Sequence, residues 1–524
     1  MNGFPITEQK TNLRIATPYY PYVTDYDNND LTKYMEALTG IHVVWELLPE
    51  QATPEVKEKI NLMLSAGDNL PDVFLSCGFT SAELITYGSA RLFIPLQDLI
   101  DRHAYNMKRM YEARPQVRPS MVSADGNTYT LGNFTLNEPN QLSQRFWINQ
   151  TFLDNLGMKM PTTTEEYYNY LVAVKTRDPN KNGKADEIPL VGATSGWQAV
   201  IDGFLMNPFI YNETSENSDA HNRRRIYLTN DGKIDVAFNK PGWRQGIEYL
   251  ARLCREGLLA PESFTLKKED LRSLVENESA LLVGSLPNGG PHEFASTTGE
   301  RRTHYRVLPP LKGPTGLQQT WYDEYAGAAI GNYVITKDSK IPEVAVKWAD
   351  SCYTEDFVMR NRYGVLGRDW RMPAAGVESV DGKQAMYEEI LRWGTPQSAY
   401  WGVGGVSWSR WGSYKRAKSQ DPFELEYVLW NAYETYLPYA YQMSVPKTMP
   451  FTLEESRRYN ELNRLIVEYV EQFLAECVTG RRDVAREWDN YIATLNRMGL
   501  DELLRINQAA FDRGWKSALS AKFK

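Results

Sequence analysis

Long apolar runs are missing from this sequence of 524 residues. A helix that crosses a membrane needs about 20 predominantly apolar residues in a row, and no such stretch occurs. The start of the chain shows no charged segment followed by a short apolar stretch, the pattern of a secretory leader. The sequence therefore predicts a chain without a membrane-spanning segment.

Cysteine and histidine are scarce. The chain has four cysteines and five histidines, and no C-x-x-C pair or histidine cluster accompanies them. This argues against a zinc site. Four cysteines allow two disulfides, but most of them lie in apolar helical or strand patterns, which favours buried, free thiols. The residues concerned are Cys77, Cys254, Cys352 and Cys477.

A positively charged surface is also missing. Lys and Arg number 58 against 66 Asp and Glu, the formal net charge is −8, and no basic stripe runs along any segment. We therefore expect no nucleic-acid partner, because phosphate binding depends on such a stripe. The motifs G-x-S-x-G and H-E-x-x-H are absent, so we expect no enzyme. A glycan hydrolase needs only two suitably spaced carboxylates and stays an alternative.

Aromatic residues are abundant. They make up 12% of the chain, with 32 Tyr and 14 Trp, while 42% hydrophobic and 24% charged residues are ordinary for a soluble globular protein. The length exceeds what one hydrophobic core usually serves, which predicts two lobes or more.

The first 80 residues alternate strand and helix patterns. Strands are predicted at 13–20, 41–48 and 71–76, and helices at 31–40 and 54–67, with Gly40 ending the first helix. This order predicts βαβ units, a parallel sheet and an α/β fold. Ligands bind beyond the carboxyl ends of such strands, here near Tyr20 and residues 76–79. The apolar stretch 325–336 is predicted to return to this sheet, and the C-terminal third is predicted to be helical.

Residues 178–189, "DPNKNGKADEIP", resemble a calcium loop. An EF-hand loop supplies oxygen ligands from alternate positions and places Gly at the sixth for a sharp turn. The twelfth position, where a bidentate Glu is expected, is Pro189, so Glu187 is the natural replacement. The predicted ligands are Asp178, Asn180, Asn182, the carbonyl of Lys184, Asp186 and Glu187. The alternative is an Asn- and Gly-rich turn without an ion. A sensor role would need a second, paired loop, and none occurs, so we expect a structural Ca²⁺.

Several motifs spread along the chain resemble one family. The chain resembles the extracellular solute-binding proteins, family 1, of carbohydrate ABC importers. The likeness is strongest to the subgroup with the alginate-oligosaccharide binding proteins and lipoproteins of Gram-positive bacteria. The motifs are "INLMLSAGDNLPDVFLS", "LFIPLQDLID", "DGNTYTL", "FWINQTFLDNLGMKMPTTTEEYYNYL", "DPNKNGKADEIPL", "YVITKDSKIPEVAVKWAD", "RYGVLGRDW" and "REWDNYIATLNRMGLDELLRINQAAFDR". In the alginate-binding relatives the loop pattern binds calcium through the six matching positions.

The resemblance implies a two-lobed periplasmic-binding-protein type II fold. The ligand cleft would lie between the lobes, which are joined by a hinge with several chain crossings. We expect residues 1–143 and 327–382 in the N-terminal lobe, and residues 144–326 and 383–524 in the C-terminal lobe with the calcium loop. The implied function is capture of an oligosaccharide and its delivery to the permease subunits of an ABC transporter by a monomer. The opening "NGFPIT" resembles the region after a lipidated cysteine, which implies a lipid-anchored precursor on the extracellular face, its signal and cysteine removed.

Aromatic residues on loops are the candidates for sugar binding, because rings stack on the apolar faces of sugars while polar groups bind the hydroxyls. The stretch "YWGVGGVSWSRWG" at 400–412 is rich in Trp and Gly, which indicates a loop and a stacking platform. The alternative for every ring is ordinary hydrophobic packing, which we expect for Trp348 and Trp488. The candidates are Trp401, Trp408, Trp411, Trp370, Trp197, Trp321 and Tyr20, with Asp323, Arg368 and Arg410 as polar partners.

The arginines leave the charge of the sugar open. Arg368, Arg371 and Arg410 lie near candidate rings, and a guanidinium binds a carboxylate in a bidentate manner. If the arginines bind the ligand in this way, the ligand is an acidic, uronate-containing oligosaccharide. If these arginines pair with local acids such as Asp369, a neutral oligosaccharide fits better. A peptide-binding protein is a further alternative, although a peptide receptor would show polar loops that read the main chain rather than Trp clusters.

Overall fold

The structure is a computed structural model of the whole chain, and it describes residues 4–51, 54–115, 117–135, 137–214, 225–324, 328–391, 395–402, 405–409 and 415–523. No helix within these ranges is both long enough and apolar enough to cross a membrane. The four cysteines are free, as the sequence predicts, and three of them are buried.

The first part of the chain builds most of a six-stranded sheet. Its elements are β1 (Thr11–Tyr19), α1 (Asp30–Thr39), β2 (Ile41–Glu50), α2 (Pro54–Ala66), β3 (Val73–Leu75), α3 (Ser81–Ser89), α4 (Gln97–His103), α5 (Tyr105–Ala113), α6 (Val117–Met121) and β4 (Leu131–Thr135). The predicted βαβ order is confirmed, since β1 pairs in parallel with β2 and with β3. Gly40 ends α1 with a positive φ of 76°, which a residue without Cβ adopts without strain.

The chain then builds a second body. Its elements are α7 (Glu138–Gln141), β5 (Phe146–Asn149), α8 (Gln150–Leu156), α9 (Thr164–Thr176), α10 (Ile201–Leu205), β6 (Ile226–Leu228), β7 (Ile234–Val236), α11 (Pro241–Arg255), η2 (Pro261–Phe264), α12 (Lys268–Val275), β8 (Ser285–Pro287), α13 (Pro291–Phe294), η3 (Arg301–His304) and β9 (Tyr305–Val307). Strands β8, β5 and β9 form an antiparallel sheet in that order. At the start of α9, Thr163 and Glu166 form a capping box.

The chain returns to the first sheet and leaves it again. The returning elements are β10 (Ala328–Ile335), α14 (Pro342–Ser351), α15 (Glu355–Tyr363), β11 (Trp370–Arg371), β12 (Glu388–Glu389) and β13 (Ser407–Ser409). The last part is helical, as predicted, with α16 (Leu425–Tyr436), η5 (Leu437–Tyr439), α17 (Leu453–Val478), α18 (Val484–Arg497), α19 (Leu500–Gly514), α20 (Lys516–Leu519) and η6 (Ser520–Lys522). The six-stranded sheet has the order β13-β4-β10-β3-β1-β2.

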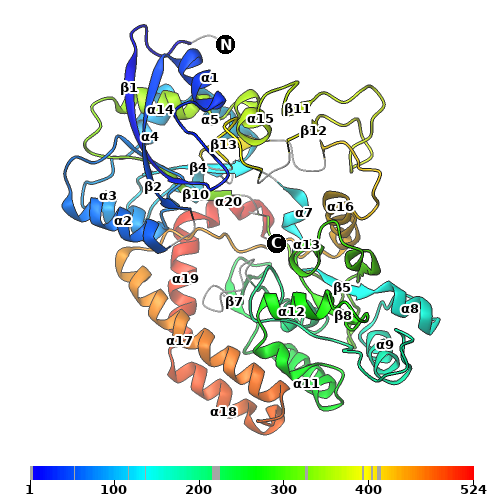
Figure 1. Cartoon of the computed structure of the whole chain (residues 1–524). Helices are drawn as coiled ribbons and strands as arrows, with labels where there is room; N and C mark the ends of the chain where they lie inside the picture. Colours follow the sequence, from blue (N-terminus) through cyan, green and yellow to red (C-terminus); the bar gives the residue numbers. More distant parts are fainter. Residues whose placement is uncertain are drawn as a thin grey trace.

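These elements make two lobes, which Figure 1 shows one above the other. We call the six-stranded sheet and its helices the N-terminal lobe, and the β8-β5-β9 sheet and its helices the C-terminal lobe. In the N-terminal lobe, Leu13 and Ile15 of β1 pack on one side of the sheet and Ala16 on the other. Alternation along each strand therefore buries both faces, as in other α/β folds.

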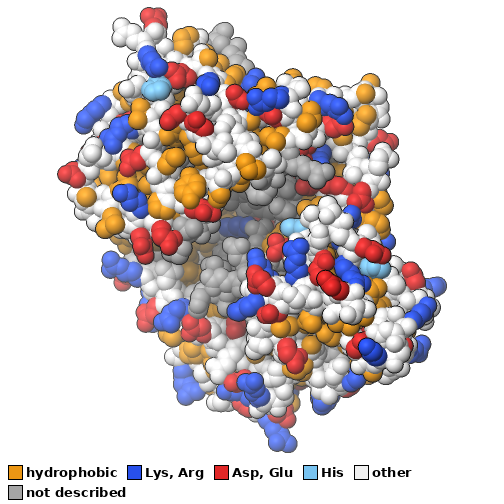
Figure 2. Space-filling view, viewed as in Figure 1, with side chains coloured by type: hydrophobic (Ala, Val, Ile, Leu, Met, Phe, Trp, Pro, Cys, Tyr) orange, Lys and Arg blue, Asp and Glu red, His pale blue; other side chains and the backbone are white. Residues whose placement is uncertain are grey.

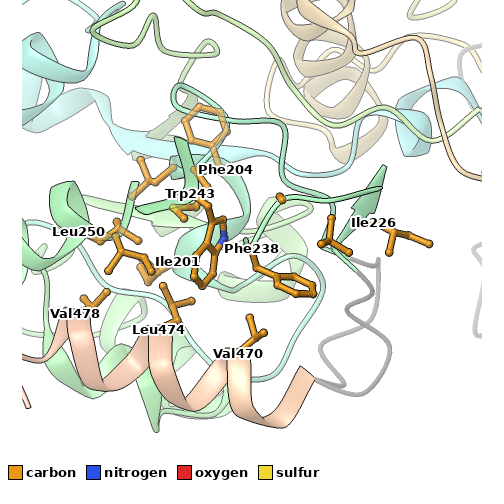
Figure 3. Packing of buried hydrophobic residues seen from close by; sticks show 14 of the residues in the cluster. Ile201, Phe204, Ile226, Phe238, Trp243, Leu250, Val470, Leu474 and Val478 are labelled. Atoms are coloured by element: carbon orange, nitrogen blue, oxygen red, sulfur yellow. The ribbon is translucent and has the colours of Figure 1, made fainter. Parts of the chain in front are cut away.

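A separate core holds the C-terminal lobe together. Helices α11 and α17 pack against each other in it, and Figure 3 shows Val470, Leu474 and Val478 on one side of α17, facing Trp243 and Phe238. The three residues lie at a helical spacing of four, which places them on one stripe. Leu465 of the same helix is exposed, because it lies on the side of α17 that faces away from this core.

One predicted lobe boundary needs correction. Residues 383–409 are expected in the C-terminal lobe, but β13 pairs in parallel with β4 of the N-terminal sheet. Tyr400, Trp401 and Trp408 are buried in the same core as Leu13 and Tyr333. Residues 399–402 and 405–409 therefore lie in the N-terminal lobe, because their apolar side chains are buried there.

Candidate functional site

The junction between the lobes is where the predicted site residues are expected. Figure 2 shows the surface hollowed between the two lobes, and Figure 1 places α7, α13 and α16 beside this hollow on the side of the C-terminal lobe. The chain passes through the junction between β4 and α7, and Asp323 on the returning segment donates its N–H to the carbonyl of Gln141, 2.8 Å away. Two of the chain segments that pass between the lobes are thus hydrogen-bonded to each other.

Trp197 lies in the C-terminal lobe, where its ring centroid is 5.8 Å from that of His292 of α13, and it is only partly buried. Its ring is flat against Gly289, where a Cβ would come within 2.1 Å of the indole, so no other residue fits at that position. The next residue, Gln198, has a φ of 56°, an uncommon conformation for a residue other than Gly. Strained backbone of this kind concentrates at functional sites, where surrounding contacts hold it. The contact of Trp197 with a sugar stays a prediction.

Tyr20 is the second partly buried candidate ring. It follows β1, and its ring centroid lies 5.5 Å from that of Tyr22. Gly402 approaches both rings so closely that a Cβ there would lie 2.9 Å from the Tyr22 hydroxyl and 3.1 Å from the Tyr20 ring. The structure therefore brings two segments singled out by the sequence, the end of the first strand and the glycine-rich loop, into contact.

Trp401 and Trp408 lie in the core of the N-terminal lobe. Trp401 is 3% exposed, stacks on Trp348 at 5.9 Å between centroids and meets Trp45 edge-on at 5.2 Å. Trp408 is 6% exposed and belongs to β13. The alternative interpretation, packing beneath the loop, holds for both rings in this conformation, because the faces that a sugar would need are covered. Trp411 and Arg410 lie outside the described residues.

Trp370, Trp321 and Asp323 are also buried. Trp370 is 8% exposed, packs with Met359 and Tyr387, and donates its Nε1–H to the carbonyl of Gly364. Trp321 and Asp323 are each 3% exposed on the segment that crosses between the lobes. The Asp323 carboxylate forms an ion pair with Lys447 at 2.6 Å. These residues serve packing and the lobe junction here, and their predicted contact with a sugar is not supported by their exposure.

The arginines are already paired with carboxylates. Arg368 contacts Asp369 and Asp30, each at 2.7 Å, and these hydrogen bonds raise its pKa. Arg371 binds Glu388 through two nitrogens, at 2.6 and 2.9 Å. Within the described part of the chain the guanidinium groups proposed for an acidic sugar thus bind local acids, the alternative that the sequence left open.

The loop at 178–189 adopts a tight turn with the expected oxygen-rich side chains facing inward. The N–H groups of Asn182 and Gly183 donate to the Asp178 carboxylate at 3.2 and 2.9 Å, and the N–H of Lys184 donates to the Asn182 side chain at 2.8 Å. Gly183 has a φ of 76°, as its place at the sharp turn predicts. The loop conformation fits the predicted ligand spacing.

The acids of this loop do not form a tight cluster. Among the described residues no three His, Cys, Asp or Glu side chains gather in a group able to hold a metal. Instead the amide nitrogens of Asn180 and Asn182 donate to Asp186 and lower its pKa. Glu187 behaves in the opposite way: burial raises its pKa, and the charges of Asp178 and Asp186 add to this. Rotation of the two amides by half a turn presents oxygens in place of nitrogens, so the donor set fits a hard cation that would relieve this repulsion.

Some polar groups near Trp197 were missed by sequence reasoning. Arg145, just before β5, and His292 of α13 lie beside its ring, at 5.6 and 5.8 Å from its centroid. The pair Gly289–Gly290 before "PHEF" was the signal that could have found His292, because adjacent glycines permit close approach of other groups. Nothing in the local sequence of Arg145 sets it apart.

The chain is similar over most of its length to a known sugar-binding protein. No protein-family model matches the chain. It is 27% identical, over 97% of its own length and 91% of the relative's, to the fructooligosaccharide ABC transporter substrate-binding protein FusA of Streptococcus pneumoniae. The structure of FusA in complex with kestose matches with a TM-score of 0.72 and 25% identity, covering 96% of this chain and 99% of that one. A further FusA structure is described as an EF-hand mutant.

More distant structures share the fold. A human-milk-oligosaccharide (HMO) binding solute-binding protein of Bifidobacterium longum infantis matches with a TM-score of 0.78 at 20% identity, covering 96% of this chain and 99% of that one. The alginate-binding protein AlgQ2 without calcium ion matches with a TM-score of 0.65 at 21% identity, covering 97% and 99%. FusA is a sugar-binding protein of an ABC transporter, and the structural neighbours share the two-lobed fold, which confirms the predicted resemblance and fold class.

Proposed function

We propose that this protein is the oligosaccharide-binding component of an ABC importer. The observation that carries the proposal is the likeness to FusA over nearly the whole length of both chains, together with a partly buried Trp held rigidly in the C-terminal lobe. In this role the protein binds its sugar between the lobes and presents it to permease subunits. We propose that it acts as a monomer, carries out no catalysis, and is anchored by a lipid to the extracellular face of the membrane.

The proposed ligand is a neutral oligosaccharide. Arg368 and Arg371 are engaged by Asp369, Asp30 and Glu388, so they are not available to a uronate carboxylate. FusA is named for fructooligosaccharides, which are uncharged. An acidic ligand is the second candidate, since YtcQ of Bacillus subtilis, 21% identical over 64% of this chain and 62% of its own length, is named for polygalacturonan and rhamnogalacturonan binding.

The loop at 178–189 is proposed to hold a structural Ca²⁺. Asp178, Asn180, Asn182, Asp186 and Glu187 would supply side-chain oxygens and Lys184 its carbonyl, the ligand types that Ca²⁺ prefers. Bound there, the cation neutralises the carboxylates and fixes the loop between α9 and the bridge that joins Ile188 to Val283. The descriptions of the FusA mutant and of AlgQ2 support a calcium loop in related proteins.

Ligand binding is proposed to close the lobes. In the predicted division the chain passes between the lobes several times. A ligand that contacts both lobes favours the closed state and shifts an existing equilibrium. Small-angle scattering with and without sugar measures this change, and an unchanged radius of gyration would count against closure.

A thermal-shift screen tests the function. The panel contains kestose, nystose, trigalacturonate and a tripeptide mixture, each added to the calcium-loaded protein. A neutral sugar that binds the folded state raises the melting temperature by mass action, by about 2.7 kcal/mol of stability at a hundredfold excess over Kd. A shift with trigalacturonate alone would favour the acidic alternative. A shift with peptides and with no sugar would refute the proposed function.

A further inference from the structure

Residues 415–424 cross from one lobe to the other, and the first part of this segment is bonded to the N-terminal lobe. The N–H of Ala417 donates to the carbonyl of Tyr387, and the N–H of Lys418 donates to the carbonyl of Glu378, both at 2.9 Å. Tyr387 is buried in a small cluster with residues of α15 and β11. Helix α15 contributes to the core of the N-terminal lobe. The segment up to Lys418 therefore belongs to that lobe.

The end of the same segment is bonded to the C-terminal lobe. Arg302 of η3 forms an ion pair with Asp421 at 2.6 Å and donates to the carbonyl of Phe423 at 2.9 Å. Glu424 is the N-cap of α16, and its carboxylate accepts from the N–H groups of the second and third residues of that helix at 3.1 and 3.3 Å. Tyr436 of α16 is part of the core of the C-terminal lobe. The chain from Asp421 onward therefore belongs to the C-terminal lobe.

The crossing itself is thus residues 419–420, and one side chain spans it. Arg416 lies before the crossing, and its Nη1 donates to the Glu424 carboxylate beyond the crossing at 3.3 Å. Its Nη2 lies 3.4 Å from the carboxylate of Glu389 of β12. Strand β12 pairs with β11 in the N-terminal lobe, and Figure 1 shows β12 above α16. A single guanidinium therefore joins carboxylates that belong to different lobes.

This bridge is partly withdrawn from solvent. The side chains of Arg416, Glu424 and Glu389 are 31, 21 and 14% exposed. Those of Arg371 and Glu388, an ion pair between β11 and β12, are 62 and 40% exposed. An exposed ion pair contributes little, whereas the loss of one partner from a partly buried pair leaves the other charge without compensation. A lobe orientation that separates Arg416 from Glu424 is therefore disfavoured.

We propose that Arg416 and Glu424 form a brace across this crossing, which stabilises the orientation of the lobes in this structure. Glu389 and the adjoining backbone fix Arg416 to the N-terminal lobe, while Glu424 is fixed to the C-terminal lobe as a helix cap. Rotation of the lobes at residues 419–420 moves the two side chains relative to each other and strains their ion pair. The brace therefore sets part of the equilibrium between lobe orientations that a ligand has to shift. It acts in the ligand-free protein and does not depend on the identity of the sugar.

The distance between spin labels on the two lobes of the ligand-free protein tests the brace. The labels are attached to Glu58→Cys on α2 and Asn490→Cys on α18, both exposed, in a background with Cys254→Ser. Pulsed electron paramagnetic resonance then gives the distribution of the distance between them. Arg416→Met should widen this distribution or shift its mean, and Glu424→Gln should do the same. Glu424→Gln keeps the oxygen that caps α16, so it provides the test if Arg416→Met does not fold.

Two further variants show whether the effect belongs to the pair. Arg371→Met is the matched control, because it breaks the exposed ion pair with Glu388 and leaves the crossing intact, so its distribution should equal that of the wild type. The double variant Arg416→Met/Glu424→Gln should widen the distribution no more than either single variant, since the same interaction is removed only once. Equal distributions in the wild type and both single variants, or an equal widening in Arg371→Met, would overturn the brace. Neither result would affect the proposed sugar-binding function, which the thermal-shift screen tests separately.

Discussion

Replacing Trp401 should unfold the protein more easily without weakening sugar binding. The ring is 3% exposed and contacts Trp348, Trp45 and Phe357 at centroid distances of 5.9, 5.2 and 5.8 Å. Its Nε1–H donates to the Thr32 hydroxyl at 2.7 Å. Trp401→Ala therefore removes the centre of an aromatic cluster, and we expect a loss of about 3 to 5 kcal/mol of unfolding free energy. Trp401→Phe keeps an aromatic ring but loses the Nε1–H donor. We expect it to lower the unfolding free energy by about 1 kcal/mol for the lost hydrogen bond, and by a further, smaller amount for the cavity that the smaller ring leaves.

Urea denaturation followed by circular dichroism measures the loss, and titration with the panel sugar at 10 °C measures affinity where the variants stay folded. Trp197→Leu is the reciprocal control, because its ring lies partly exposed in the C-terminal lobe and its loss should weaken binding more than stability. A Trp401→Phe variant with wild-type stability and much weaker sugar binding would refute the reasoning, since it would mean that the ring reaches the ligand.

Three other perturbations give distinct outcomes. Chelation with EGTA should lower the melting temperature and leave sugar affinity nearly unchanged at temperatures where the protein stays folded. In Asp178→Asn the melting temperature should no longer respond to EGTA. Loss of sugar binding without loss of fold would mean that the ion lies at the ligand. Arg225→Met should lower the free energy of unfolding in urea by about 3 to 5 kcal/mol, because it leaves Asp202 and Glu471 without their buried cation. The control Arg244→Met breaks an exposed ion pair and should lower it by about 0.5 kcal/mol or less. Burial lowers the pKa of His292 below its ordinary 6.5, so the folded state disfavours the proton; its contribution to stability is complete above pH 6.5 and is lost as the pH falls through the lowered pKa. The melting temperature of the wild type should therefore fall more steeply than that of His292→Gln between pH 7 and 5, and parallel curves would contradict this.

Local patterns in the sequence were sufficient for many of the elements and for the likeness to solute-binding proteins. The strand–helix order of the first 80 residues predicts the parallel part of the sheet, and Gly40 marks the end of α1 where the structure has it. The ligand spacing of the loop at 178–189 and Gly183 at its turn also follow from the sequence. These features depend on residues close together in the chain, so the sequence contains their geometry directly.

The choice among the aromatic residues is different. Trp197 and Trp401 both lie beside glycines on predicted loops, and no local pattern separates them. Only the folded chain shows that Trp348 and Trp45 cover Trp401, while Arg145 and Gly289 fix Trp197 in the C-terminal lobe. Likewise the sequence offers Asp369 as a local partner of Arg368, but only the fold shows the second partner, Asp30, more than 300 residues away in the chain.

Sequence alone thus determined much of the secondary structure, the two-lobed architecture through resemblance, and the calcium-loop pattern. Tertiary structure alone decided which rings are buried, which charges are paired, and to which lobe β13 belongs. The physical reason is that exposure and ion pairing depend on contacts between segments distant in the chain, which periodicity and spacing do not encode.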